Sequence, residues 1–211
     1  LEFQFEMGAK QYGSRDFAAQ IAKDYNVVLS SNKQLDEYSM QMLEKYRAET
    51  KNMMNNGIHR LFLGKPMSHK MIYEAVHHFY NTLPDKNGTP SGNPLIITLD
   101  HSWLVKKSDA EKDKFEVLYN TVEMLMKLKN ELPVIIIMLS QLNRTIDEAI
   151  RKVPGSIANY PTSSDIFGGD ALMQGSDMLV VLNRPAKVDI RCYGPQKYVA
   201  NDDTIFMHLL K

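Results

Sequence analysis

Two short apolar runs, each preceded by a proline and followed by polar residues, most constrain the fold of this chain. The first is PLIITLD, residues 94–100, and the second is PVIIIMLSQ, residues 133–141. Runs of this length and branched composition, bounded by turn residues, indicate strands that are buried on both faces. A helical pattern over about 110–131 joins them into a βαβ unit. The sequence therefore predicts an α/β fold, a three-layer α/β/α arrangement with a mostly parallel central sheet.

Strand and helix patterns alternate along the rest of the chain. The expected helices span residues 9–24, 33–55, 68–80, 110–131 and 164–174, and the further strands span 1–5, 59–63, 178–182 and 204–211. The expected connections are a short extended or loop segment at 27–31, a loop at 84–93, a polar stretch to 163 with a helix at 147–152, and a hairpin-like segment at 183–203. Both ends fall inside expected strands, so we expect residues 1–211 to be a single domain core truncated at both ends.

The composition gives no indication of a partner, but it excludes an internal disulfide and a membrane span. Lys plus Arg and Asp plus Glu are both 25, so net charge favours neither a nucleic acid nor a membrane, and any such surface must be a local patch. The single cysteine, Cys192, excludes an internal disulfide and a thiolate cluster and favours a reducing compartment, the cytoplasm. No apolar run approaches the ~18 residues of a membrane span.

Three polar residues follow expected strands and are candidates for chemistry. Asp100 ends the first proline-led strand, Gln141 follows the second, and Glu6 follows the strand at the amino terminus. Ligands of open parallel sheets bind at the carboxyl ends of strands. There a carboxylate can hold the magnesium of a nucleotide, an amide can contact a γ-phosphate, and a glutamate can deprotonate the attacking water. Taken alone, each of these residues is more often a turn, cap or solvated surface residue.

Taken in order, these segments resemble the RecA-type motor domain of the DnaB-like replicative DNA helicases. LSQLNR at 139–144 is the most specific and resembles the family's third motif. IITLD at 96–100 resembles the Walker B strand, and FEM at 5–7, with Arg15 eight residues after Met7, resembles the catalytic-glutamate segment. The fourth motif is represented by SDI at 164–166, Gln174, Asp177 and the strand 178–182, followed by Arg184.

The resemblance implies a function and a set of roles. It implies an ATP- and Mg²⁺-dependent helicase that translocates on single-stranded DNA as a homo-oligomeric ring, expected to be a hexamer, with a primase or a helicase loader as further partners. Glu6 would be the catalytic base, Asp100 the magnesium carboxylate and Gln141 the phosphate sensor. The other nucleotide-facing residues would be Arg15, Arg184 and Lys211, and the DNA-facing residues, in a channel loop at 144–174, would be Arg144, Gly168, Gly169 and Gln174. A bacterial or phage-infected cytoplasm is the expected location.

The chain also departs from the family pattern. No Walker A motif is present, and residues 8–14, GAKQYGS, imitate one but lack its lysine. Residues 167–170, FGGD, replace the usual Arg-Glu-Ser-Gly, and the arginine expected two residues after Lys211 lies beyond the last residue. The fragment is therefore expected to hydrolyse ATP poorly. A RecA-type recombination or repair ATPase, and a non-hydrolysing scaffold or loader subunit, remain alternatives, and the divergence suggests a phage or mobile-element origin.

Other polar and aromatic residues are better explained by structure than by chemistry. His77 and His78 lack the spacing of metal ligands. A structural role is expected for His101, and packing roles are expected for Trp103 and Tyr160. The charged residues between 106 and 114 alternate in sign, which is typical of a solvated face.

Overall fold

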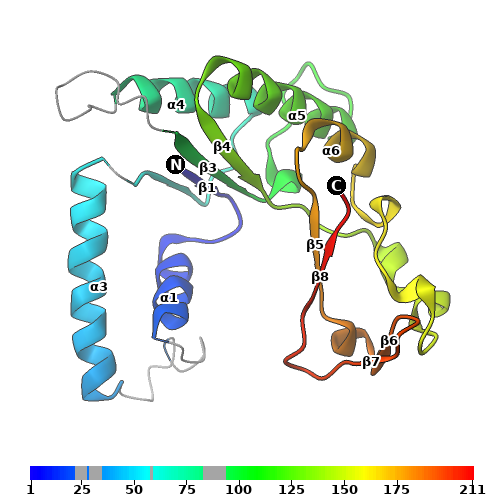
Figure 1. Cartoon of the computed structure of the whole chain (residues 1–211). Coiled ribbons are helices and arrows are strands. Elements are labelled where there is room, and N and C mark those ends of the chain that lie inside the picture. Colours follow the sequence, from blue (N-terminus) through cyan, green and yellow to red (C-terminus); the bar gives the residue numbers. More distant parts are fainter. Residues whose placement is uncertain (22–27, 29–34, 58, 83–93) are drawn as a thin grey trace. The chain divides into compact units, whose positions relative to one another are not determined.

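A computed structural model describes residues 1–21, 28, 35–57, 59–82 and 94–211 (Figure 1). The described residues divide into two compact units. The first comprises residues 1–106 and 127–139, and the second comprises residues 107–126 and 140–211. The expected end of the first helix, the segment at 27–31, the start of the second helix and the loop at 84–93 lie largely outside the described residues.

The first unit is built on a four-stranded parallel sheet in the order β2-β1-β3-β4. Its strands are β1 (Glu2–Gln4), β2 (Leu61–Leu63), β3 (Leu95–Asp100) and β4 (Val134–Met138). The two proline-led segments lie side by side, and the Leu95 N–H donates to the carbonyl of Pro133 over 2.9 Å. The prediction of an α/β fold with a parallel central sheet is confirmed.

The strands β3 and β4 are buried on one face only. Along β3 the side chains of Ile97 and Leu99 are 0% and 1% exposed, whereas Ile96 is 53% exposed. Ile135 and Ile137 of β4 are also about half exposed, at 50% and 49%. Successive side chains of a strand point to opposite faces, so these three isoleucines share a face. The expected burial on both faces is therefore wrong, because among the described residues only one face of these two strands is well covered.

Helix α4 (His69–Thr82) covers the buried face of the sheet (Figure 1). The hydroxyl of Ser68 accepts from the Met71 N–H over 3.3 Å and caps the start of the helix. The apolar stripe of the helix recurs at helical spacing, and its buried members are Ile72, Val76 and Phe79.

Helices α1 (Ala9–Gln20) and α3 (Glu37–Asn55) pack against each other in the same unit. The Tyr46 hydroxyl donates to Asp16 over 2.8 Å, and the rings of Tyr46 and Phe17 lie 5.7 Å apart. The carboxylate of Asp36 caps α3 by accepting from a backbone N–H of its first turn.

Helix α5 (Lys114–Glu131) begins four residues later than expected. Asp113 caps it, since its carboxylate accepts from the Glu116 N–H over 2.9 Å. The preceding residues form a turn in which Glu111 accepts from both the N–H and the hydroxyl of Ser108. A capped turn there competes with further helix, which explains the later start.

Besides most of α5, the described residues of the second unit form two antiparallel strand pairs and one short α-helix. Strand β5 (Val180–Asn183) pairs with β8 (Phe206–Leu209), and β6 (Cys192–Tyr193) pairs with β7 (Tyr198–Val199). The latter pair confirms the hairpin expected within 183–203. Helix α6 covers Gly169–Gly175. The chain turns through 3-10 segments at Arg144–Asp147, Ala149–Lys152, Ile157–Asn159, Ser163–Asp165 and Pro185–Val188.

Two helix predictions in this unit are wrong. Residues 147–152 form parts of two 3-10 turns that are joined at Glu148 in extended backbone. The helix expected over 164–174 is interrupted, because Ile166 is extended and Gly168 adopts a left-handed conformation with φ of 67°. Glycine adopts this conformation at little cost, so the chain can reverse there and start α6.

Among the helices of the described residues, none combines the length and apolar character needed to cross a membrane.

Candidate functional site

The carboxyl ends of β1 and β3 bring two of the predicted site residues to one edge of the sheet. In the parallel register Gln4 lies opposite Asp100, and the Phe5 N–H donates to the Asp100 carbonyl over 2.9 Å. Glu6 follows directly and is exposed, whereas Asp100 is partly buried. The peptide bond after Asp100 is cis. Two carboxylates that are far apart in the sequence thus occur on adjacent strands at the same edge.

The side chain of Gln4 connects these two residues. Its Nε2 donates to Asp100 Oδ2 over 2.5 Å, and its Oε1 accepts from the Glu6 N–H over 3.1 Å. Gln4 is only 2% exposed. A buried amide that lacks hydrogen bonds is costly, and here both ends of the amide are satisfied by the two candidate residues.

Helix α1 contacts the same face of β1 at Glu2, two residues before Gln4. The Tyr12 hydroxyl donates to Glu2 Oε2 over 2.8 Å, and His59 Nε2 lies 3.3 Å from the same oxygen. Burial, and then the hydrogen bond to Glu2, raises the pKa of the Tyr12 hydroxyl well above its usual value. The hydrogen bond from Tyr12 to Glu2 therefore ties α1, which follows Glu6, to β1, which precedes it.

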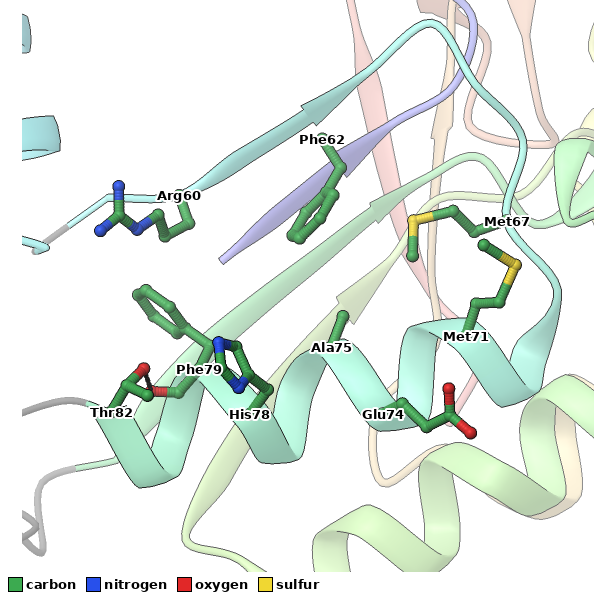
Figure 2. A pocket seen from close by; sticks show the side chains of 9 residues that line it. All are labelled: Arg60, Phe62, Met67, Met71, Glu74, Ala75, His78, Phe79 and Thr82. Carbon is green, nitrogen blue, oxygen red and sulfur yellow. Dashed lines mark hydrogen bonds between the residues drawn. The ribbon is translucent and has the colours of Figure 1, made fainter.

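A groove lies on the opposite face of the same sheet, between β2 and α4 (Figure 2). The ring of Phe62 points into it from β2 and stacks on the buried Phe3 with ring centroids 4.9 Å apart. Its other lining residues are Arg60, Met67, Met71, Glu74, Ala75, His78, Phe79 and Thr82. None of the predicted site residues lines this groove, and the side chains of Gln4 and Asp100 belong to the other face.

In the second unit, Gln141 begins a short ladder with the segment that precedes α6. The Phe167 N–H donates to the Gln141 carbonyl over 3.1 Å, and Leu142 forms a bridge with Ile166. The Asn143 N–H donates to the Asp165 carbonyl over 2.7 Å. Backbone hydrogen bonds therefore tie the segment just before the predicted channel loop to residues 165–167 within it.

Asp165 anchors the interior of this loop. It is 1% exposed, and its carboxylate accepts from the N–H and hydroxyl of Thr162, at 2.7 and 2.9 Å, and from the guanidinium of Arg151. Arg151 also donates to the carbonyls of Ala158 and Tyr160 at 2.9 and 2.8 Å. A buried carboxylate requires such partners, since burial of an unpaired charge is strongly unfavourable.

The model of one protein family, the DnaB-like helicase C terminal domain, matches residues 2–199, nearly the whole chain. The chain belongs to this family. The resemblance expected from the motif order is thereby confirmed. A search of curated proteins finds no match.

Two solved structures show the fold that this DnaB-like chain adopts. One is a DnaB-like replicative helicase, described with its interactions with primase, at 18% identity and a TM-score of 0.69 over 99% of this chain. The other is the ATPase domain of a second protein, at 17% identity and a TM-score of 0.68, also over 99% of this chain. The chain spans 46% of the first of these proteins and 69% of the second.

The residues expected to face a nucleotide are distributed over both units of the DnaB-like chain. Arg15 is exposed on α1 in the first unit, whereas Gln141, Arg184 and Lys211 belong to the second. The Arg184 guanidinium donates to the Asp202 carbonyl over 2.7 Å, and Lys211 Nζ donates to the Met173 carbonyl over 2.6 Å. Of the six residues expected at the nucleotide, only Glu6, Asp100 and Arg15 therefore belong to the unit that contains the parallel sheet.

The residues expected to face DNA differ in their exposure and packing in the DnaB-like fold. Arg144 and Gln174 are not buried. The Gly169 N–H donates to the Ile166 carbonyl over 3.0 Å and so takes part in a backbone hydrogen bond. A Cβ on Gly168 would lie 2.0 Å from Leu118 Cδ2, and one on Gly169 would lie 2.2 Å from the Ser163 carbonyl oxygen. Close packing therefore explains both glycines.

The segment GAKQYGS, residues 8–14, is not a phosphate-binding loop. Ala9–Gln20 is helical, and the Tyr12 N–H donates to the Gly8 carbonyl over 3.0 Å. Backbone N–H groups of this helix beyond its first turn are used in helical hydrogen bonds and cannot cradle a phosphate.

The weaker candidates take structural positions. Tyr160 packs on Tyr193 with ring centroids 5.3 Å apart, as expected for packing. His77 lies 3.0 Å from the carboxylate of Glu131, which also accepts from the Tyr73 hydroxyl. In the part of the chain that the structure describes, no group of three or more His, Cys, Asp or Glu side chains has the geometry of a metal site.

Sequence reasoning missed two residues that organise these regions. Gln4 is a single polar residue between Phe3 and Phe5, and only the register of β1 against β3 shows that it reaches Asp100. Arg151 is one of several charged residues in a polar stretch. A polar side chain between two apolar residues in a buried strand was the available signal for Gln4.

Proposed function

We propose that the chain is the motor core of a DnaB-like helicase that hydrolyses ATP with magnesium while it translocates on single-stranded DNA. The intact protein would form a ring, with a hexamer as the expected size, and a primase or a helicase loader is the proposed further partner. The observation that carries the proposal is the position of Glu6 and Asp100 on adjacent parallel strands at one edge of the sheet. Family membership and the fold of two solved relatives support it.

The donor set fits a magnesium ion. Mg²⁺ prefers oxygen ligands and is commonly held by one or two carboxylates together with substrate phosphates and water. Asp100 offers a carboxylate with Oδ2 held by Gln4, which leaves Oδ1 as the oxygen that would reach the ion. When bound, magnesium neutralises charge on the phosphates of ATP. The groups that bind the phosphates of ATP would come from residues other than 9–14, since these are helical.

Glu6 has the position of a general base. It is exposed, follows β1 directly, and has its backbone N–H held by Gln4. A carboxylate there would accept a proton from the water that attacks the γ-phosphate. Gln141, whose carbonyl is tied to the segment before α6, is proposed to sense the γ-phosphate and to transmit its loss to the DNA-facing loop that contains Arg144 and Gln174.

The test is Glu6→Gln in the intact protein. We expect ATP turnover to fall by roughly 10²- to 10⁴-fold, the usual contribution of a general base, with nucleotide binding retained. Glu37→Gln is the matched control, because Glu37 is an exposed carboxylate in the first turn of α3 in the same unit. Turnover by Glu6→Gln within a few fold of the control would remove Glu6 from the mechanism.

The alternatives predict different results for the unaltered intact protein. A recombination or repair ATPase would hydrolyse ATP without separating the strands of forked DNA. A scaffold or loader subunit would show no ATP turnover of its own. This alternative is retained because these 211 residues contain no Gly-x-x-x-x-Gly-Lys-Ser/Thr sequence. Strand separation that depends on ATP and on Glu6 would support the helicase.

A further inference from the structure

We propose that Gln4 is a positioning residue that holds Asp100 and the start of Glu6 in one fixed arrangement for magnesium-dependent hydrolysis. The inference rests on the function proposed for Glu6 and Asp100. It assigns a role to a residue that neither the motif pattern nor the family match identifies.

The arrangement of hydrogen bonds permits only one orientation of the Gln4 amide. Its NH₂ group faces the Asp100 carboxylate, which accepts, and its carbonyl faces the Glu6 N–H, which donates. A rotated amide would place oxygen against oxygen at Asp100 and N–H against N–H at Glu6. The side chain therefore has a defined direction, and both neighbours select it.

Burial makes this arrangement rigid. Gln4 is 2% exposed, so water is not available to replace either hydrogen bond. The bond to a charged carboxylate is the stronger of the two. A displacement of Asp100 Oδ2 would therefore shift the backbone of Glu6, because one side chain joins the Asp100 carboxylate to the Glu6 N–H.

No other common side chain reproduces both contacts. Methionine has a similar length but neither donates nor accepts strongly, and glutamate matches the shape but adds a second carboxylate beside Asp100. Two carboxylates at 2.5 Å would have to share a proton. These differences provide two variants with distinct expected results.

The experiment measures ATP turnover and the binding of a fluorescent ATP analogue in the intact protein, each over a range of Mg²⁺ concentrations. For Gln4→Met we expect the Mg²⁺ concentration at half-maximal turnover to rise about 10- to 100-fold, the usual effect of removing a group that orients a metal ligand. The gain in analogue affinity on adding Mg²⁺ should shrink by a similar factor, with affinity in the absence of Mg²⁺ unchanged.

Tyr12→Phe is the matched control. It removes one hydrogen bond, that from Tyr12 to Glu2, on the same face of β1 without touching Asp100 or Glu6. We expect its Mg²⁺ dependence to equal that of the unaltered protein. A purely structural role for Gln4 would instead give the two variants the same Mg²⁺ dependence, and that result would overturn the proposal.

The pH profile of Gln4→Glu gives a second test, which decides the question if Gln4→Met does not fold. When protonated, the introduced carboxyl group can donate to Asp100 as the amide does, so activity should approach that of the unaltered protein at acidic pH and decline as pH rises. A profile parallel to that of the unaltered protein would overturn the proposal.

The outcomes also separate this inference from the proposed function. An intact protein without Glu6-dependent ATP turnover would refute both. An active protein that is inactivated by Glu6→Gln, but whose Gln4→Met variant keeps its turnover and Mg²⁺ dependence within twofold, would refute only the role of Gln4.

Discussion

The ion pair between Arg151 and Asp165 gives the most quantitative prediction about the second unit. Arg151→Met removes the cation but keeps an unbranched apolar chain. The Asp165 carboxylate is 1% exposed and would lose its charged partner. Breaking a buried ion pair by removal of one partner costs about 3–5 kcal/mol.

The remaining hydrogen bonds place the expected cost at the lower end of that range. Asp165 would keep two donors from Thr162 and a longer one, at 3.3 Å, from the Thr145 hydroxyl, and these partly satisfy its charge. The carbonyls of Ala158 and Tyr160 would each lose a hydrogen bond, but both residues are partly exposed, so water replaces these bonds and they add little to the cost. We therefore expect a local destabilisation of about 3–4 kcal/mol, which corresponds to roughly 150- to 900-fold in an opening equilibrium.

Hydrogen exchange monitored by mass spectrometry is the appropriate assay, because it reports local opening. Peptides that cover residues 141–167 contain the N–H groups of Asn143, Thr162 and Phe167, all of which are hydrogen-bonded in this region. Their protection should fall by about two orders of magnitude or more in Arg151→Met.

Arg191→Met is the matched control in the same unit. Arg191 and Asp202 also form an arginine–aspartate pair, at 3.3 Å, but their side chains are 58% and 68% exposed. Exposed pairs contribute at most about 1 kcal/mol. If exchange in 141–167 changed equally little in both variants, the reasoning that buried Asp165 depends on Arg151 would be refuted.

Two further predictions concern stability. Gly168→Ala should lower the melting temperature, by an amount equivalent to about 1–3 kcal/mol of stability, because the new Cβ would lie 2.0 Å from Leu118 Cδ2 at a φ of 67°. Gly13→Ala, in helix α1 with open space around it, should instead raise the melting temperature, by an amount equivalent to at most about 1 kcal/mol. Equal shifts of melting temperature in the two variants would contradict the packing account of Gly168. Burial lowers the pKa of His208, so the unfolded chain takes up its proton more readily, and stability should fall as pH drops from the ordinary histidine value through the lowered one. The loss of melting temperature between about pH 7.5 and about pH 5.5 should therefore be smaller in His208→Gln, and an identical loss would remove His208 as a cause.

The parallel sheet could be predicted because its signals are local. The runs PLIITLD and PVIIIMLSQ contain their own boundaries, and the helix between them has an apolar periodicity. Their pairing then followed from the βαβ unit that they form with this helix, and the structure places them side by side. The same runs could not show that Ile96, Ile135 and Ile137 would be half exposed, because coverage depends on what packs on the sheet.

The features that sequence reasoning missed depend on distant contacts. Gln4 reaches Asp100 across 96 positions, and only the strand register determines that pairing. The break before α6 depends on the approach of Leu118 to Gly168, which no local pattern reveals. The motif order identified the family, since it needed only residue types and their sequence, whereas the supporting residues needed coordinates.

A crystal structure of the intact protein with Mg²⁺ and a non-hydrolysable ATP analogue tests the central claim most directly. We predict that Asp100 Oδ1 lies within the coordination sphere of the ion, directly or through one water, with the Gln4 amide still on Oδ2 and with Glu6 facing the γ-phosphate. A nucleotide bound elsewhere, for instance in the groove beside Phe62, or an ion remote from Asp100, would contradict it.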